Sequence, residues 1–225
     1  MSFIIARRLA TVATLLGLAL TASPSRADII VDHSPPGTTG YYSDVAIPAQ
    51  IIADNFTLAT AAAPDSITFW GGYVSGNVPL NPDLFSLAFY DNAGGLPGTL
   101  ISSFSIAPSR ALAGGKLVGV SDTYLYTAGF ASVNLVAGTY WVSVVNDSSA
   151  SPANGWVWAS SANPYDGVVA ISHDSSRTPT NWFNSGSDMA FTLSASRSVP
   201  EPSSMVLAGL GGLFAMAYRI RRRRG

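Results

Sequence analysis

The sequence predicts an all-β protein, an antiparallel β-sandwich of jelly-roll type, and three observations support this. No stretch between residues 28 and 198 shows a sustained helical period. Short apolar or alternating segments fill this region, and clusters of Gly, Pro, Asn, Asp and Ser separate them. The spacing of these clusters predicts around eleven short strands, which is typical of a sandwich. About 170 residues supply enough chain for one hydrophobic core.

Alternation of apolar and polar residues locates the strands. Phe85, Leu87 and Phe89 fall on one face of a strand, as apolar residues at every second position do. Between strands, the segment 91–98 contains the glycines and proline that a turn requires. The segment 110–115 is ambiguous between strand and loop. We expect strands at residues 29–33, 51–58, 66–74, 84–91, 99–106, 117–126, 131–135, 139–146, 155–160, 167–172 and 189–194.

Residues 1–27 have the features of a secretory signal peptide. Arg7 and Arg8 precede an apolar segment at 9–22, and small residues, Ser25 and Ala27, occupy the positions that a signal peptidase recognises. We therefore expect signal peptidase to cleave before Asp28, leaving an ectodomain at 28–198 and a C-terminal segment at 199–225.

The ectodomain is acidic and contains no cysteine. Twelve aspartates oppose four basic residues in 28–198, a net charge of −8, although the whole chain has a formal charge of −1. This charge argues against nucleic acid as a partner, because binding there depends on Lys and Arg contacts to phosphates. Without cysteine, disulfide bonds and thiol catalysis are excluded.

Catalytic motifs do not emerge from the sequence, and we expect that the protein is not an enzyme. Its two histidines, His33 and His173, are far apart, and no metalloprotease, serine-hydrolase or P-loop motif occurs. Glycoside hydrolases use two opposed carboxyl groups, and 28–198 contains no glutamate. A secreted hydrolase that uses paired aspartates stays open as an alternative.

Calcium is the one cofactor for which the sequence offers candidate ligands. Asp54 and Asp188 lie near the two ends of the domain, where the first and last strands of a sandwich can meet. No calcium-binding loop motif accompanies them, and the alternative is that these aspartates cap turns or contribute to solubility.

Five tryptophans make carbohydrate a candidate ligand, because sugar rings stack on aromatic faces. Trp156 and Trp158 are two residues apart and therefore share a face of a strand. Trp182 lies in a loop-like segment and is expected to be the most exposed of the five. The alternative for the group is packing between two sheets.

The C-terminal segment combines a motif, an apolar helix and a basic end. Pro200, Glu201 and Pro202 precede an apolar segment at 203–218, and Arg219 and Arg221, Arg222, Arg223 and Arg224 follow it. A helix over these sixteen apolar residues spans about 24 Å, slightly less than the hydrocarbon core of a bilayer. We expect one transmembrane helix with its arginines in the cytoplasm and the ectodomain outside.

This order of elements resembles the PEP-CTERM sorting signal. The resemblance implies that Pro200, Glu201 and Pro202 form the motif recognised by an exosortase, a membrane-embedded processing enzyme. It also implies that 203–218 is a transient membrane anchor and that the arginines retain it. The known context of the family is Gram-negative bacteria that make exopolysaccharide. The ectodomain is similar, more weakly, to β-sandwiches that carry such tails, at 53–56, 89–91, 96–98 and 188–191.

From these features we expect an exported surface or matrix protein that is associated with exopolysaccharide, biofilm or adhesion. The alternatives are an inert structural component of the matrix and the secreted hydrolase named above.

Overall fold

The computed structural model describes residues 27–46, 49–74, 79–119, 121–151, 153–174 and 179–196. The expected signal peptide up to Arg26, the Pro-Glu-Pro motif, the transmembrane helix and the arginine cluster lie outside the described residues. In the ranges that are described, no helix has the length and apolar character needed to cross a membrane.

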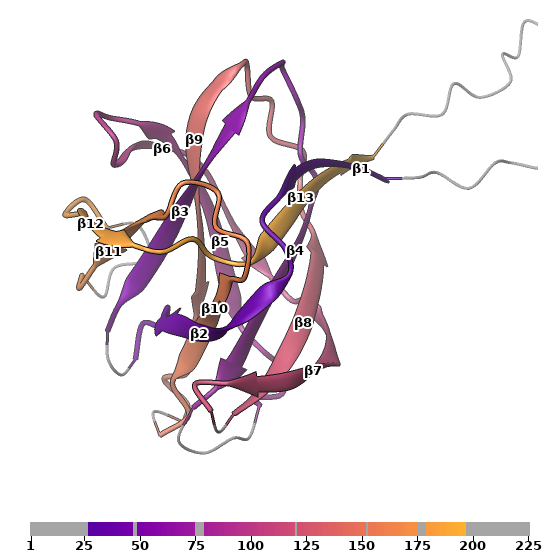
Figure 1. Ribbon diagram of the computed structural model, residues 1–225, viewed down its shortest axis with the longest axis vertical. Helices are drawn as coiled ribbons and strands as arrows, with labels where there is room; N and C mark the ends of the chain where they lie inside the picture. Colours follow the sequence, from indigo (N-terminus) through magenta and orange to yellow (C-terminus); the bar gives the residue numbers. More distant parts are fainter. Residues whose placement is uncertain are drawn as a thin grey trace, which may run out of the picture. The chain divides into compact units, whose positions relative to one another are not determined.

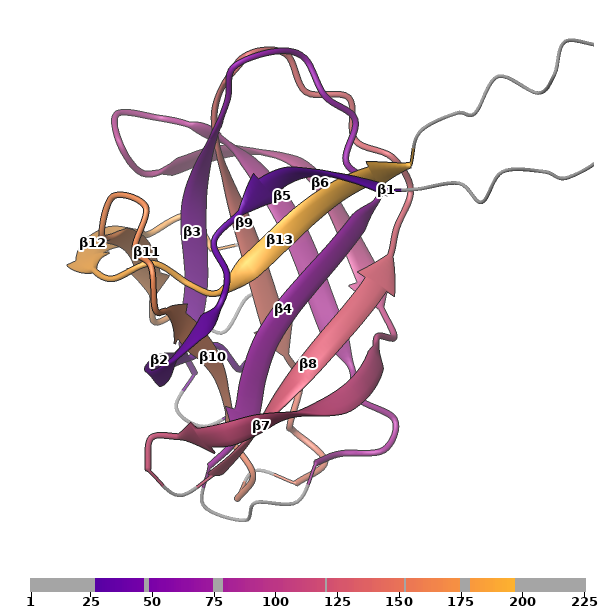
Figure 2. The same ribbon diagram turned by 45° about the vertical axis from the view of Figure 1, so that its right-hand side comes forward.

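The described residues form two antiparallel sheets (Figures 1 and 2), which confirms the predicted all-β sandwich. A seven-stranded sheet has the order β1-β13-β4-β10-β2, with β8 paired to β4 and β7 to β8. Its strands are β1 (Ala27–Asp32), β2 (Pro36–Tyr42), β4 (Ser66–Tyr73), β7 (Ser109–Leu117), β8 (Ser121–Gly129), β10 (Trp156–Ser161) and β13 (Phe191–Ser196).

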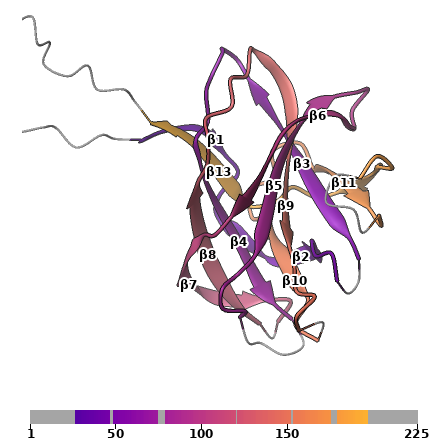
Figure 3. The ribbon, with the colours of Figure 1, turned by 180° about the vertical axis from the view of Figure 1, so that it is seen from behind.

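The second sheet has six strands in the order β12-β11-β3-β9-β5-β6, and Figure 3 shows it from behind. Its members are β3 (Ile51–Leu58), β5 (Phe85–Asn92), β6 (Pro97–Ile106), β9 (Gly138–Asn146), β11 (Val168–Ser172) and β12 (Phe183–Gly186). Strands distant in the sequence are neighbours in this sheet, because β3 lies between β11 and β9.

The core lies between the two sheets, where alternation along each strand directs apolar side chains inward. Phe85, Leu87 and Phe89 on β5 are buried as predicted, and they pack with Phe69 and Phe191 of the opposite sheet in one cluster. Burial of each such ring contributes roughly 1.5–3 kcal/mol to the free energy of folding. The sandwich is therefore stabilised by its own core, as a chain without disulfides requires.

Two glycines on β4 lie where neighbouring strands approach this strand closely. A Cβ atom at Gly71 would lie 2.3 Å from the Trp156 ring, and one at Gly72 would lie 2.5 Å from the Asp122 carbonyl oxygen. Only glycine fits there, because any Cβ would overlap these atoms.

The predicted strands are largely confirmed, with specific exceptions. The segment 131–135 forms no named strand and contributes only a bridge, in which Leu135 pairs with Ala62. Two strands were not predicted, β2 and β12, because the first contains Pro36 and two glycines and the second is four residues long. The ambiguous segment 110–115 belongs to β7, an exposed edge strand.

The first and last strands of the domain are paired with each other. Ala27 lies opposite Ser196 and Asp28 lies opposite Ala195 in an antiparallel ladder. The chain therefore enters and leaves the sandwich at adjacent positions on one sheet (Figure 2).

Candidate functional site

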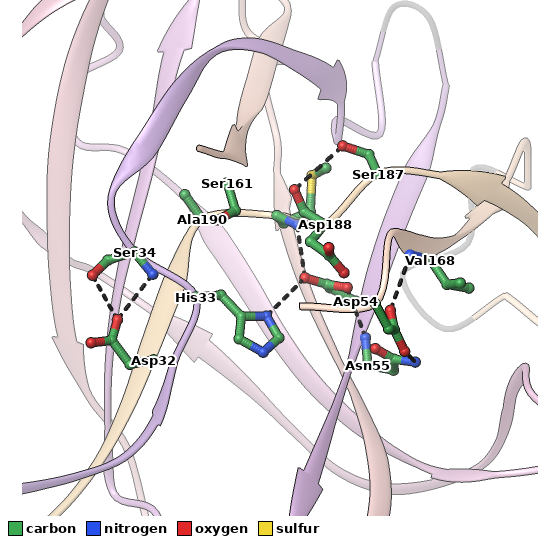
Figure 4. Close-up of polar contacts among 12 residues, drawn as sticks. Asp32, His33, Ser34, Asp54, Asn55, Ser161, Val168, Ser187, Asp188 and Ala190 are labelled. Atoms are coloured by element: carbon green, nitrogen blue, oxygen red, sulfur yellow. Dashed lines mark hydrogen bonds and ion pairs between the residues drawn. The ribbon is translucent and has the colours of Figure 1, made fainter. Parts of the chain in front are cut away.

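Asp54 is a carboxylate on the inner face of β3, between two apolar residues of the core. The side chains of Ile52 and Phe56 lie on the same face of the strand, and Asp54 has no exposed surface. Its Oδ2 accepts a hydrogen bond from the Met189 backbone N–H at 2.7 Å, and its Oδ1 accepts one from the Asn55 N–H at 2.9 Å. The structure therefore brings this residue next to the chain around Asp188, as the calcium hypothesis requires (Figure 4).

Asp188 is also buried, in the segment that precedes β13. Its Oδ2 accepts the Gly167 backbone N–H at 2.8 Å, and its backbone oxygen accepts the Ser161 N–H at 2.7 Å. The other carboxylate oxygen, Oδ1, has no hydrogen-bond partner among the described residues. Figure 4 shows the two carboxylates close together. One buried acceptor at this position is thus left unsatisfied.

His33 is the third member of this cluster, and the sequence did not indicate it. It follows β1, and its Nδ1 lies 3.4 Å from Asp54 Oδ2. One face of the imidazole stacks on Tyr165, with ring centroids 5.1 Å apart, and Phe191 lies 4.6 Å away. The available signal was the position of Asp54 between inward apolar residues, since a buried carboxylate needs a polar partner.

Burial raises the pKa of Asp54 to about 7, because a charged carboxylate loses its hydration inside the sandwich. The hydrogen bond and charge of His33 and the Met189 N–H oppose this shift, and the nearby charge of Asp188 adds to it. Asp54 therefore exchanges its proton near neutral pH.

The cluster offers few free ligands for calcium. Calcium takes six to eight oxygen ligands, whereas both oxygens of Asp54 already accept backbone hydrogen bonds. In the part of the chain that the structure describes, no group of three or more His, Cys, Asp or Glu side chains could hold a metal ion. Calcium at Asp54 and Asp188, like hydrolysis by paired aspartates, stays a prediction.

Trp156 and Trp158 share a face of β10, as predicted, but this face is the core. Both side chains are 0% exposed. Trp156 packs edge-on against Phe69 and Phe85, and the Trp158 Nε1–H donates to the Ala190 carbonyl at 3.1 Å. The expectation that these two rings stack on sugar is therefore wrong, because they fill the space between the sheets.

Trp182 lies on the opposite side of the six-stranded sheet from the core. Its half-buried ring packs with Tyr90 and Trp141, and we name these three residues the outer-face aromatic cluster. The rings of Tyr90 and Trp182 meet edge-on with centroids 5.7 Å apart. Of the three tryptophans proposed for stacking, Trp182 alone is partly exposed.

A second ionic group joins an arginine that is partly exposed to a buried aspartate. The Arg110 guanidinium on β7 pairs with Asp83, and the Tyr73 hydroxyl donates to the same carboxylate at 2.5 Å. The Arg110 side chain also lies over the Tyr124 ring. Arg110 on β7 and Tyr73 on β4 thus contact the same Asp83 carboxylate, so this group connects β7 to β4.

Two hollows in the surface of the sandwich contain no ionisable side chain among their lining residues. Their volumes are about 340 Å³ and about 200 Å³. The larger is lined by Ala61, Ala62, Ala63, Asn134, Leu135 and Val136, and the smaller by Leu84, Phe85, Ser105, Ile106 and Ala107. Neither has an acidic or basic side chain in its lining, and Ser105 supplies a hydroxyl in the smaller one with no base among the other lining residues.

Comparison with known families identifies the C-terminal segment. Residues 198–223 match the PEP-CTERM protein-sorting motif, which confirms the resemblance stated for Pro200, Glu201 and Pro202. The motif marks an exported, membrane-anchored protein with its ectodomain outside and an exosortase as its processing partner. No curated protein matches the chain.

Solved structures with some similarity include capsid proteins of infectious bursal disease virus. A mutant VP2 protein in derived T=1 particles is 8% identical over 81% of this chain and 43% of its own, with a TM-score of 0.20. A VP2 subviral particle is 9% identical over 89% of this chain and 50% of its own, again at 0.20. The chain spans half or less of these proteins, and scores this low support no argument about fold or function.

Proposed function

We propose that the exported domain binds extracellular polysaccharide at the cell surface or in the matrix and acts there in association or adhesion. The position of Trp182 carries this proposal. The residue is half-buried, and its indole packs edge-on against Tyr90 on the outer face of the six-stranded sheet. An aromatic ring on this face offers a sugar a stacking surface.

The sorting motif and the composition support the same function. The sorting motif marks an exported protein that an exosortase processes. The resemblance to this family implies a setting in exopolysaccharide-producing bacteria, where such a domain would meet a polymer to bind. Cleavage by signal peptidase and removal of the transient C-terminal anchor would leave a mature acidic domain, released to the surface or to a biofilm matrix. Such a domain has no need of a catalytic group.

Retention on polysaccharide tests the proposal. The mature protein is applied to a glycan array and to immobilised exopolysaccharide from the producing cells. We expect retention, and we expect Trp182→Ala to weaken it at least tenfold. Trp70→Ala is the matched control, because Trp70 is a half-buried tryptophan of the other sheet. No retention of the unmodified protein on either surface contradicts the proposal.

An inert or self-associating matrix component is the second candidate, and the burial of Trp141, Trp156 and Trp158 favours it. Iodide quenching of tryptophan fluorescence separates the two. A sugar site requires quenchable emission from Trp182 that polysaccharide protects, whereas in an inert component polysaccharide leaves the quenching unchanged. A broad glycosidase and esterase screen tests the hydrolase alternative at Asp54 and Asp188.

A further inference from the structure

Three polar atoms on the outer face of the six-stranded sheet are buried and have no hydrogen-bond partner among the described residues. They are Asn55 Oδ1, the Tyr90 hydroxyl and Trp182 Nε1. Each belongs to the outer-face aromatic cluster or to its immediate neighbour in the sheet. A buried polar group without a partner costs roughly 1–3 kcal/mol, so three on one face require a physical explanation.

The strand register places two of these atoms on either side of Trp141. Asn55 on β3 is the direct partner of Trp141 on β9, and Trp141 is the direct partner of Tyr90 on β5. The Trp141 Nε1–H donates to Asn92 Oδ1 at 3.0 Å, so its own polar atom is satisfied. An indole face is thus flanked by an unsatisfied amide oxygen and an unsatisfied hydroxyl.

The adjacent row across the same strands consists of small side chains. Ala170 pairs with Ala53, Ala53 with Ser143, and Ser143 with Ala88. All four are buried, and the Ser143 hydroxyl donates to the Ile52 carbonyl at 2.7 Å. Trp182 packs over this region with Leu96 and Val168, so a large ring covers a row that has little bulk of its own.

We propose that this face, at Asn55, Tyr90 and Trp182, binds one ring of a neutral saccharide, with the indole of Trp182 moving aside to stack on it. The inference rests on the proposed polysaccharide binding and names its site. Sugar hydroxyls both donate and accept, so they satisfy Asn55 Oδ1, the Tyr90 hydroxyl and Trp182 Nε1 together. The row of small side chains, Ala170, Ala53, Ser143 and Ala88, leaves space for the sugar ring that larger side chains would fill.

The charge around the site selects a neutral sugar. Asn55 Nδ2–H donates to Asp166 Oδ2 at 2.8 Å, which places a carboxylate beside the site. The basic residues in the described part of the chain, Arg110 and Lys116, belong to β7 of the other sheet and pair with aspartates there. Among the described residues, an anionic sugar would meet the Asp166 carboxylate with no cationic side chain to compensate.

Calorimetric titration with free neutral sugars tests the site. The mature protein is titrated with glucose, galactose, mannose, N-acetylglucosamine and their β-linked disaccharides. Tyr90→Phe removes one hydroxyl and keeps the ring, and we expect the Kd to rise about tenfold. Ala88→Leu fills the small row, and we expect binding to be lost while the circular dichroism spectrum is retained.

Tyr126→Phe is the matched control. The Tyr126 hydroxyl is likewise buried, but it lies in the core between the sheets. Its removal should leave the Kd unchanged.

The outcomes separate this inference from the function on which it rests. If the unmodified protein binds polysaccharide and Tyr90→Phe binds it equally well, the site is wrong and the proposed function stands. If the protein binds only anionic polymers, the proposal that the site takes a neutral saccharide is wrong. If nothing binds, both proposals are overturned.

Discussion

The carboxylate of Asp54 accepts the backbone N–H of Met189 across 135 residues of sequence, at a distance of 2.7 Å. This bond joins β3 of one sheet to the segment leading into β13 of the other. A charged or a neutral carboxylate can accept it, but only the neutral form avoids the cost of a buried charge. The protonation state of one side chain is therefore linked to the closure of the sandwich.

Stability should fall as the pH rises through neutrality. The pKa of Asp54 is raised in the folded state, from 3.8 to about 7, so the folded state binds the proton more tightly than the unfolded state. The resulting stabilisation is complete below about pH 4 and is lost as the pH rises through 7; it amounts to at most about 4 kcal/mol. Urea denaturation at pH 5, 6, 7 and 8 measures it.

Asp54→Asn should flatten this dependence, because an amide does not titrate. Asp32→Asn, at an exposed position, should leave the slope unchanged. If the free energy of unfolding changes with pH equally in the unmodified protein and in Asp54→Asn, the pH dependence does not come from Asp54.

Val118 is a β-branched residue at a left-handed backbone position, with φ of 53°. Such a residue is strained there by about 1–2 kcal/mol, whereas asparagine tolerates the conformation. We expect Val118→Asn to raise the Tm by roughly 2–4 °C. Val136→Asn is the control, since it is also an exposed valine but does not have a positive φ. A Tm that falls in both variants would refute the strain.

Phe191 connects the aspartate cluster to the core. Its ring is fully buried and contacts His33, Phe56 and Trp158. Phe191→Ala should lower the free energy of unfolding by roughly 3–5 kcal/mol, because it removes apolar contacts and leaves a cavity. Phe183→Ala, at a ring 46% exposed, should change it by less than about 1 kcal/mol. Chemical denaturation compares the two.

Calcium at Asp54 and Asp188 makes a separate prediction. Binding to the folded state would raise the Tm in millimolar calcium relative to a chelator. The change Asp188→Asn should abolish that rise. It replaces a carboxylate whose Oδ1 has no partner among the described residues with a neutral amide, which is a weaker calcium ligand. Differential scanning fluorimetry decides, and an identical Tm with calcium and with chelator would exclude the site.

The sorting motif predicts the mature C-terminus. Replacing Pro200, Glu201 and Pro202 by alanine should prevent processing, because the exosortase loses its recognition motif. Mass spectrometry of the membrane-bound and the released protein should then find the variant in the membrane with Arg221–Arg224 intact and the released unmodified protein without them. Intact arginines on both would argue against cleavage.

Periodicity predicted the strands well where one face is apolar. The bounds of β3 were predicted without error, and Ile52, Phe56 and Leu58 lie on its inward face. It failed for β2, where glycines and Pro36 suggest a turn although neighbouring strands hold the segment extended. The alternation of apolar and polar residues shows which side chains share a face of a strand. It does not show whether that face meets the core or solvent. Trp156 and Trp158 were therefore grouped correctly on one face, and of the two environments left open for them the structure shows the core.

The polar sites were harder to predict because they form between distant segments. Asp54 and Asp188 were proposed together from their places at the two ends of the domain, and the structure brings them together. His33 joins them through the chain path after β1, which no local pattern specifies. Similarly, Asn55, Trp141 and Tyr90 align only once the register of three strands is fixed.

The pairing of Ala27 with Ser196 sets an order of events during export. The Ala27–Asp28 bond, where signal peptidase is expected to cut, lies inside the ladder between β1 and β13. A paired strand is protected from proteolysis until it opens locally. Cleavage at this expected site would therefore have to precede the pairing of β13 with β1. The leader would then be removed in the interval between the synthesis of β1 and that of β13.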